Sequence, residues 1–337
     1  MTGRPAQVVL PFKQWPYRGG ETHYRQIRPG ALTAVRSARH KVTERAPISI
    51  PEGALMSASP SPCPRSVIVA RLRDAGCVFA EDEARLLISA APRPAELAAM
   101  VDRRAAGLPI EHVLGWAEFC GLRIAVDPGV FVPRRRTEFL VRRAASLARQ
   151  AAKPAGQAPG RPRTFVVDLC CGSGAIGAAL VAVLDGVELH AVDVDPAAVR
   201  CARRNVAASG GQVYEGDLYQ PLPATLRGHV DILVANAPYV PAGAIGLLPP
   251  ESRMHEPRAA VDGGADGLDI LRRVAAAAPL WLAPGGHLLV ETSERQAPQA
   301  VEAFACSGLI PRVASSSQLN ATVVIGARPG PKSGPGG

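Results

Sequence analysis

The chain has 337 residues, enough for one large or two ordinary domains, and its 47% hydrophobic content can supply a substantial core. The formal net charge is +9, but residues 1–55 hold nine Lys or Arg against three Asp or Glu, so 9 − 3 = +6 lies there and +3 in the rest. The basic balance is therefore no argument for a nucleic-acid substrate of the remaining chain.

The sequence also argues against a secreted protein, a membrane protein, a disulfide-bonded protein and a zinc protein. No stretch has the apolar region of a signal peptide or approaches the roughly 18 apolar residues of a membrane span. We therefore expect a cytoplasmic protein with no membrane partner. The seven cysteines are odd in number and lack both a Cys-x-x-Cys pair and Cys/His ligand spacing. This pattern argues against a disulfide framework and against a zinc site, so we expect no bound metal.

The N-terminal part of the chain changes character twice. Residues 1–60 predict a disordered basic extension that includes the first half of a Ser/Pro-rich link at 57–64, and the sequence leaves open whether residues 1–55 belong to the natural protein. Amphipathic helical spacing then predicts a small helical domain over residues 61–112. Strand-like apolar positions punctuated by Gly121 predict a linking β-hairpin over residues 113–132.

The remaining chain reads as one α/β domain. Beyond a Pro/Gly/Ala-rich linker at 153–163, strands and helices alternate to about residue 328. Such alternation predicts a Rossmann-like domain over residues 133–328, built on a doubly wound parallel sheet. Residues 329–337 are rich in Pro and Gly and predict a disordered tail.

A glycine-rich turn follows the first strand of that domain. Gly172, Gly174 and Gly177 satisfy the dinucleotide fingerprint Gly-x-Gly-x-x-Gly, and Asp193 ends the next strand, where it would accept hydrogen bonds from ribose hydroxyls. A dinucleotide cofactor must therefore be weighed. Asp168 argues against it, because a carboxylate at the mouth of the loop would repel a pyrophosphate. The same carboxylate would hold the ammonium of S-adenosylmethionine, the cofactor we predict.

A second motif, Asn236-Ala237-Pro238-Tyr239, ends the apolar run 230–235. The proline keeps the preceding residue extended, so the Asn236 side chain and the adjacent carbonyl are held as two converging acceptors. Tyr239 adds a flat face. An amide or exocyclic amine is planar and carries two N–H donors, so the motif indicates methyl transfer to a planar nitrogen.

The chain from about Ser66 to Arg328 resembles the HemK/PrmC class of protein glutamine N(5)-methyltransferases. Besides the Asp168 loop, the resemblance is carried by Gly107-Leu108-Pro109-Ile110-Glu111-His112-Val113-Leu114-Gly115, Phe131-Val132-Pro133-Arg134 with Thr137-Glu138, Ala191-Val192-Asp193, Gly216-Asp217-Leu218, Glu256-Pro257-Arg258-Ala259-Ala260 and Gly263-Gly264-Ala265-Asp266-Gly267-Leu268. It implies a Rossmann-like S-adenosylmethionine-dependent methyltransferase. Members methylate the Gly-Gly-Gln glutamine of class I peptide chain release factors in translation termination, and a helical N-terminal domain helps to dock that substrate.

The resemblance and the residues together give a set of expected site residues. Asn236 and Tyr239 are the expected catalytic residues, with Asn236 Oδ1 and the Ala237 carbonyl accepting from the substrate amide and Pro238 fixing their geometry. Tyr239 could equally be a structural tyrosine, and Asp217 a turn residue before Pro221. The residues expected to bind the cofactor are Asp168, Cys170, Gly172, Ser173, Gly174, Asp193, Asp217, Leu218 and Asn236.

Three single residues and one segment depart from the family pattern. Ala237 replaces the first proline of Asn-Pro-Pro-Tyr, Arg136 replaces an acidic residue, Cys170 replaces a loop glycine, and residues 290–293 replace Glu-Ile-Gly. They suggest a divergent branch, for which two alternatives stay open. One is an adenine-N6 nucleic-acid methyltransferase, which needs the same acceptors but has no evident recognition module here. The other is a cofactor-binding protein without turnover.

Overall fold

The computed structural model describes residues 64–151 and 164–330. The expected N-terminal extension, the linker at 153–163 and nearly all of the expected tail lie outside the described residues. Every described residue belongs to one compact unit. None of the helices in these two ranges is long and apolar enough to cross a membrane.

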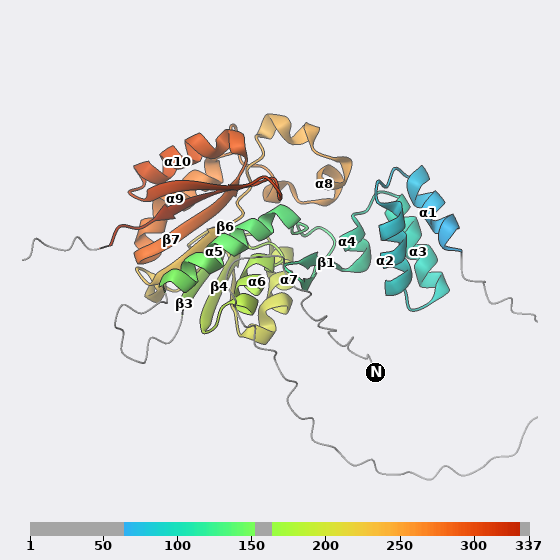
Figure 1. Cartoon of the computed structure of the whole chain (residues 1–337), viewed down its shortest axis with the longest axis horizontal. Coiled ribbons are helices and arrows are strands. Elements are labelled where there is room, and N and C mark those ends of the chain that lie inside the picture. The colour runs from blue at the N-terminus through green and yellow to red at the C-terminus, as the bar shows by residue number, and fades with distance from the viewer. Residues whose placement is uncertain (1–63, 152–163, 331–337) are drawn as a thin grey trace, which may run out of the picture. The chain divides into compact units, whose positions relative to one another are not determined.

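The first described segment is helical and ends in a hairpin (Figure 1). Its helices are α1 (Arg65–Asp74), α2 (Ala80–Ala90), α3 (Pro94–Ala105) and α4 (Ile110–Leu114). They share a small apolar core of buried side chains from α1 to α4, among them Leu72, Leu87, Met100, Val101 and Val113. The hairpin pairs β1 (Trp116–Phe119) with β2 (Leu122–Ala125).

Local backbone chemistry explains where these elements stop. Gly115 ends α4 with a φ of +79°, a left-handed conformation that glycine adopts without a steric penalty. Cys120 and Gly121 both have positive φ at the hairpin turn, at +50° and +74°. Two such residues match the twist of a tight β-hairpin. Strand structure thus begins after α4, whereas the sequence predicts it from residue 113.

The main body is built on a seven-stranded sheet of order β5-β4-β3-β6-β7-β9-β8. Its strands are β3 (Thr164–Leu169), β4 (Val187–Asp193), β5 (Gln212–Glu215), β6 (Val230–Ala235), β7 (Leu282–Thr292), β8 (Ile310–Ser316) and β9 (Ala321–Ala327). The five strands from β5 to β7 are parallel, while β9 is antiparallel to both β7 and β8.

The predicted α/β class is confirmed, but the expectation of a purely parallel sheet is wrong at one edge. Only residues 317–320 separate β8 from β9. So short a connection can close a hairpin but cannot cross over a sheet, which takes a dozen residues or more. The last two strands therefore form an antiparallel pair.

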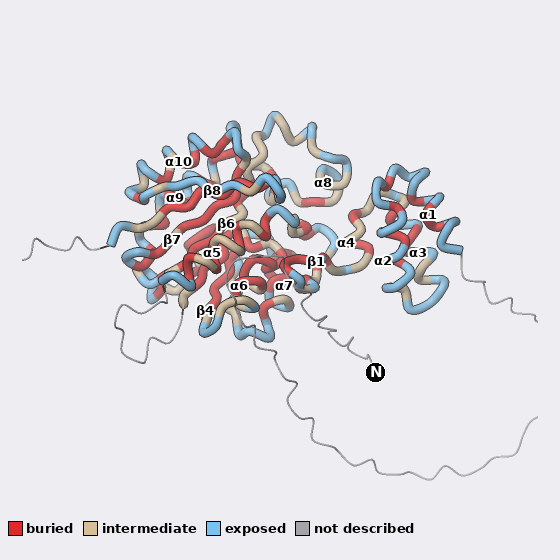
Figure 2. Tube along the Cα trace, in the orientation of Figure 1, coloured by how far each residue is buried: buried red, intermediate tan, exposed pale blue. Residues whose placement is uncertain are grey.

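Helices cover both faces of the sheet. They are α5 (Glu138–Ala151), α6 (Ala175–Val183), α7 (Pro196–Val206), α9 (Asp269–Trp281) and α10 (Ala297–Cys306). The short helix α8 (Pro250–His255) lies in the connection between β6 and α9. Apolar residues of α5 and α6 pack on one face, and those of α9 and α10 on the other. Figure 2 shows the resulting buried layer along the central strands.

The strand order places the site. From β3 the chain continues outward through β4 to β5, and it then returns to the other side of β3 to form β6 and β7. In open α/β sheets, ligands bind beyond the carboxyl ends of the strands where the order reverses. The glycine loop after β3 and the Asn236 motif after β6 meet at this point.

Candidate active site

A cavity of about 640 Å³ lies at the carboxyl ends of β3, β4, β5 and β6. The predicted site residues on its wall are Cys170, Gly172, Ser173, Asp193, Asp217, Leu218, Asn236 and Pro238. Four other predicted residues, Asp168, Gly174, Ala237 and Tyr239, do not line it. The cavity therefore joins most of the expected cofactor residues to part of the expected acceptor motif.

Asp168 lies behind the loop, fully buried. Its Oδ2 accepts a hydrogen bond from the Gly177 N–H at 2.9 Å, while Oδ1 has no partner among the described residues. Burial, together with the charge of Asp193, raises the pKa of Asp168 to about 7. A buried carboxylate with a free oxygen favours a cation nearby. This arrangement fits the ammonium group of S-adenosylmethionine.

Gly174 and Gly177 allow close packing around the loop. A Cβ on Gly174, whose φ is +75°, would lie 3.0 Å from Ala202 Cβ. A Cβ on Gly177 would lie 2.9 Å from Leu189 Cδ2. Both glycines therefore let the start of α6 approach its neighbours, a structural role that does not require them to touch a ligand.

Asp193 is held in place by the backbone at the end of β4. Its Oδ2 accepts from the Gly172 N–H at 2.8 Å, and its Oδ1 accepts from the Asp195 N–H at 2.9 Å. Burial raises the pKa of Asp193. Each carboxylate oxygen can accept more than one hydrogen bond, so Asp193 retains capacity for ribose hydroxyls.

Asp217 both forms a turn and lines the cavity. Its carbonyl accepts from the Gln220 N–H at 3.1 Å, as in a turn. It also lines the cavity, and its carboxylate forms an ion pair with Arg273. Arg273 lines the cavity as well, although no local sequence pattern marks it.

Cys170 adopts a left-handed φ of +54°, where the family has glycine. A non-glycine residue there is strained by about 1–2 kcal/mol. Burial raises the pKa of the Cys170 thiol above its usual value, followed by the charges of Asp193 and Asp168. A thiol held protonated in this way is a poor nucleophile, which agrees with a packing role.

Asn236 directly follows β6, whose last residue, Ala235, pairs with Val290 of β7. The Asn236 side chain lines the cavity and makes no hydrogen bond to another described residue. Its amide is thus available to a ligand. Pro238 also lines the cavity, whereas Ala237 is buried.

Tyr239 points toward a polar cluster beside the cavity. Its hydroxyl accepts from Arg136 Nη2 at 2.6 Å and lies within donating distance, 3.4 Å, of Glu291 Oε1. Arg136 Nε donates to the same carboxylate oxygen at 3.1 Å. Burial raises the pKa of Tyr239 to about 12, and the charge of Glu291 adds to the effect. Arg136 and residues 290–293, two departures from the family pattern, therefore meet at this tyrosine.

Other cavity residues were quoted in the family motifs but were not predicted as site residues. Besides Val192 and Gly216, they come from two segments, as Phe131, Pro133 and Thr137 in the first and Pro257, Ala259 and Ala260 in the second. Their two segments are joined by Arg134, which donates to Glu256 Oε1 at 2.6 Å. The Glu256 carboxylate is buried. Their place in the family motifs could have marked these residues as site residues. The hydrophobic periodicity of the sequence does not reveal that the two segments meet.

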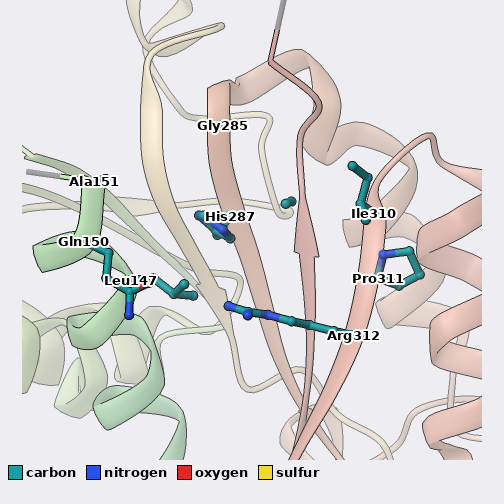
Figure 3. A pocket seen from close by; sticks show the side chains of 9 residues that line it. Leu147, Gln150, Ala151, Gly285, His287, Ile310, Pro311 and Arg312 are labelled. Atoms are coloured by element: carbon teal, nitrogen blue, oxygen red, sulfur yellow. The ribbon is translucent and has the colours of Figure 1, made fainter. Parts of the chain in front are cut away.

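A second cavity, of about 430 Å³, lies at the opposite end of the sheet. Figure 3 shows Leu147 and Gln150 of α5 facing His287 of β7 and Arg312 of β8. Burial lowers the pKa of His287, and the charge of Arg312 adds to this. No predicted site residue lines this cavity. It lies away from the strand ends where the glycine loop and Asn236 meet.

The donor set suits an adenosine cofactor with a cationic end. Carboxylates and apolar side chains line or back the first cavity. Among residues 64–151 and 164–330, no group of three or more His, Cys, Asp and Glu could hold a metal ion. Asp168, Asp193 and the 172–174 loop are thus the groups that would hold S-adenosylmethionine.

Known proteins resemble the chain over most of its length. The model of the "Methyltransferase small domain" family matches residues 156–247. The release factor glutamine methyltransferase of Geobacter sulfurreducens is 38% identical over 70% of this chain and 80% of its own length. The enzyme of the same name from Mycolicibacterium smegmatis is 38% identical over 67% of this chain and 78% of its own.

A relative whose name states a different substrate is also similar to this chain. The 4-amino-L-phenylalanine/4-methylamino-L-phenylalanine methyltransferase of Streptomyces pristinaespiralis is 34% identical over 65% of this chain and 73% of its own length. The site and these similarities agree on one chemistry. The chain belongs to the release factor glutamine methyltransferase family, a family of S-adenosylmethionine-dependent enzymes with a Rossmann-like fold.

Proposed function

We propose that this protein transfers a methyl group from S-adenosylmethionine to the side-chain amide nitrogen of a glutamine in a class I peptide chain release factor. The observation that carries the proposal is the free Asn236 amide on the cavity wall, directly after β6. The names of the relatives support this acceptor. Such a substrate would place the reaction in the cytoplasm, with no role for a membrane or for nucleic acid as the methyl acceptor.

Asn236 and Ala237 would orient the acceptor. S-adenosylmethionine supplies an electrophilic methyl group, because that group is bound to a positively charged sulfonium. An amide nitrogen is a poor nucleophile because its lone pair is delocalised. Hydrogen bonds from the two amide hydrogens to nearby acceptors become stronger as positive charge develops on the nitrogen. Asn236 Oδ1 and the Ala237 carbonyl would serve as these acceptors, since Pro238 keeps residue 237 extended.

Tyr239 would act from the edge of the site. Its hydroxyl is held by Arg136 and Glu291, and it does not line the cavity. These contacts favour the structural alternative that the sequence left open. Tyr239 would fix the end of the acceptor motif and could present a ring edge to the entering glutamine.

The helical segment would help to dock the protein substrate. Arg104 of α3 is buried and binds both carboxylate oxygens of Glu83, at 2.6 and 3.0 Å. The same guanidinium reaches Glu251 of α8 at 2.5 Å. Because α8 follows the acceptor motif in the chain, this ion-pair network links the helical segment to the substrate side of the site.

An aromatic amine is a second candidate acceptor. The relative from Streptomyces pristinaespiralis is named for an amino group on a phenylalanine ring. Such an amine is planar and would use the same two acceptors. The four departures from the family pattern leave room for a changed acceptor.

Transfer of labelled methyl to purified release factors tests the proposal. We expect label on a class I release factor and none on the same factor with its Gly-Gly-Gln glutamine changed to alanine. Cofactor binding with no label on either factor would contradict the proposed acceptor. Label on 4-aminophenylalanine alone would establish the second candidate.

A further inference from the structure

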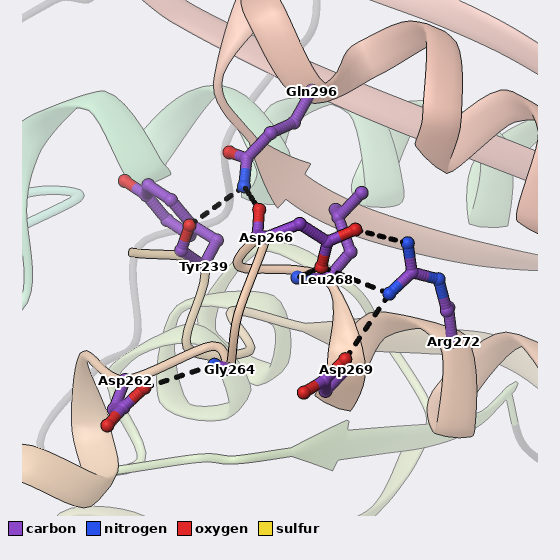
Figure 4. Close-up of polar contacts among 8 residues, drawn as sticks. All are labelled: Tyr239, Asp262, Gly264, Asp266, Leu268, Asp269, Arg272 and Gln296. Carbon is purple, nitrogen blue, oxygen red and sulfur yellow. Dashed lines mark hydrogen bonds and ion pairs between the residues drawn. The ribbon is translucent and has the colours of Figure 1, made fainter. Parts of the chain in front are cut away.

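Gln296 occupies a buried position beside the acceptor motif. It closes the short helix η6 (Glu294–Gln296), which follows β7, and only 9% of its surface is exposed. Figure 4 shows its side-chain amide between the main chain at Tyr239 and the main chain at Asp266. Nothing in its sequence neighbourhood predicts a role at the acceptor site.

Each end of the Gln296 amide has a partner. Its Nε2 donates to the Tyr239 carbonyl at 2.9 Å and to the Asp266 carbonyl at 3.0 Å. Its Oε1 accepts from Ser293 Oγ at 2.5 Å. Both donors are thus used on two carbonyls that can only accept. This pattern fixes which end of the amide carries the nitrogen.

A glycine turn closes on the same carbonyls. A Cβ on Gly267 would lie 2.3 Å from the Tyr239 carbonyl oxygen and 2.5 Å from Gln296 Nε2. A Cβ on Gly263 would lie 2.7 Å from the Pro238 carbonyl oxygen. No side chain fits at either position, so the turn approaches the acceptor motif backbone to backbone.

Backbone hydrogen bonds continue this contact. The Val240 N–H donates to Val261 at 3.0 Å, and the Ala242 N–H donates to Gly264 at 2.8 Å. Val240 in turn accepts from the Gly263 N–H at 2.9 Å. These bonds hold the chain after Tyr239, whereas Gln296 is the side chain that holds Tyr239 itself through its carbonyl.

We propose that Gln296 is a positioning residue for methyl transfer: it clamps the acceptor motif to the glycine turn and to the end of β7. The clamp sets the distance between Asn236 and the bound cofactor without touching either. This inference rests on the proposed function. It predicts a loss of turnover with little change in cofactor affinity, because the glycine loop and Asp193 lie on the other side of the cavity.

Two substitutions of Gln296 should reduce turnover to different degrees. Gln296→Met keeps the length but removes both donated hydrogen bonds. Gln296→Glu also turns a carboxylate toward two carbonyl oxygens, which repel it. We expect the rate of transfer at saturating release factor to fall on the order of 100-fold in Gln296→Glu, the cost of a misplaced reacting group. The fall in Gln296→Met should be smaller.

Gln299→Glu is the matched control. It makes the same change in the first turn of α10, where Gln299 is exposed. The control should keep wild-type turnover, and all three variants should bind S-adenosylmethionine with an affinity near that of the wild type. If Gln296→Glu matches the control in turnover, or if its loss follows weaker cofactor binding, the inference is wrong.

Hydrogen exchange separates this inference from the proposed function. The Val240 and Ala242 amides should exchange faster in Gln296→Glu than in Gln299→Glu, whether or not the release factor is the substrate. Faster exchange with an inactive wild type would support the clamp and contradict the proposed acceptor. Unchanged exchange would overturn the clamp even if the wild type methylates release factors.

Discussion

The cofactor side and the acceptor side of the cavity are built in different ways. On the cofactor side, Gly172, Asp193 and Asp217 each lie at or just after the end of a strand, and Asp193 is held by backbone N–H groups close to it. On the acceptor side, Tyr239 is held by residues far away in the sequence. Arg136 precedes it by 103 residues, and Gln296 follows it by 57.

This difference suggests how the two sides can change. A site made by strand ends depends on the fold and on a few loop residues. Substitutions elsewhere on the protein surface should therefore affect it little. A site held by distant side chains depends on each of them. Departures such as Arg136 therefore affect the acceptor more than the cofactor. The variants below test whether turnover and cofactor affinity separate along this division.

The largest expected effect is on turnover in Asn236→Ala. Removal of one preorganised hydrogen-bond partner typically costs on the order of 100-fold or more in rate. Cofactor affinity should change far less, since Asp168, Asp193 and the glycine loop are also expected to hold the cofactor. Methyl-transfer rates and S-adenosylmethionine titrations on the same preparation measure both. Near-normal turnover in this variant would remove Asn236 from the acceptor role.

The next effect is on stability in Arg136→Met. The variant leaves the Glu291 carboxylate, whose side chain is 2% exposed, without its cation. Unpaired buried charges cost several kcal/mol, but Arg136 is itself 44% exposed, so we expect a loss of about 2 kcal/mol in the free energy of unfolding. Urea unfolding measures it.

The double variant Arg136→Met/Glu291→Gln is the control for this pair. It removes both charges, and it should recover part of the lost stability because no unpaired carboxylate remains. A double variant that is as unstable as the sum of the two single variants would show that the pair is not coupled.

The affinity for S-adenosylmethionine should depend on pH. The pKa of Asp168 is raised to about 7 by burial, so the free protein takes up a proton there as the pH falls below 7. Binding of an ammonium favours the ionised form, which requires that proton to leave. The affinity for S-adenosylmethionine should therefore fall as the pH drops from 7 to 5.5, by up to about tenfold per pH unit.

Asp168→Asn provides the comparison, because its side chain does not titrate. It should bind the cofactor more weakly near neutral pH and lose most of this pH dependence. Calorimetric titrations at several pH values test both statements. An equal slope in the wild type and the variant would assign the dependence to another group, such as Asp193, whose pKa is also raised by burial.

The smallest expected effect is a gain in stability in Cys170→Gly. Glycine relieves the left-handed strain at a φ of +54°, though it removes the packing of a partly buried thiol and adds entropy to the unfolded chain. We expect a net gain of up to about 1 kcal/mol. Cys171→Gly is the control: Cys171 is buried and has no positive φ, so the same change should destabilise the protein.

Much of the cofactor side could be predicted from the sequence. The apolar run at 230–235 became β6 with the same bounds, and the strand, glycine turn and helix around Gly172 lie where the pattern placed them. Strand periodicity and glycine spacing are local properties. These local patterns predict the cofactor site because parallel strands bring their carboxyl ends to one edge of the sheet.

The acceptor side could be predicted only in part. The Asn236 motif was visible, but the partners of Tyr239 were not, because Glu291 and Gln296 lie in a segment whose pattern indicates only the end of a strand. The antiparallel edge was missed for a related reason. A short connection between β8 and β9 decides the strand direction, and the apolar pattern does not.

The most direct test of this account is a competition between the two candidate acceptors. Wild-type protein, labelled S-adenosylmethionine, a class I release factor and 4-aminophenylalanine would be mixed, and the product identified by mass spectrometry. The account predicts methyl on the Gly-Gly-Gln glutamine and its loss in Asn236→Ala. Methyl on the aromatic amine with an unmodified release factor would contradict it.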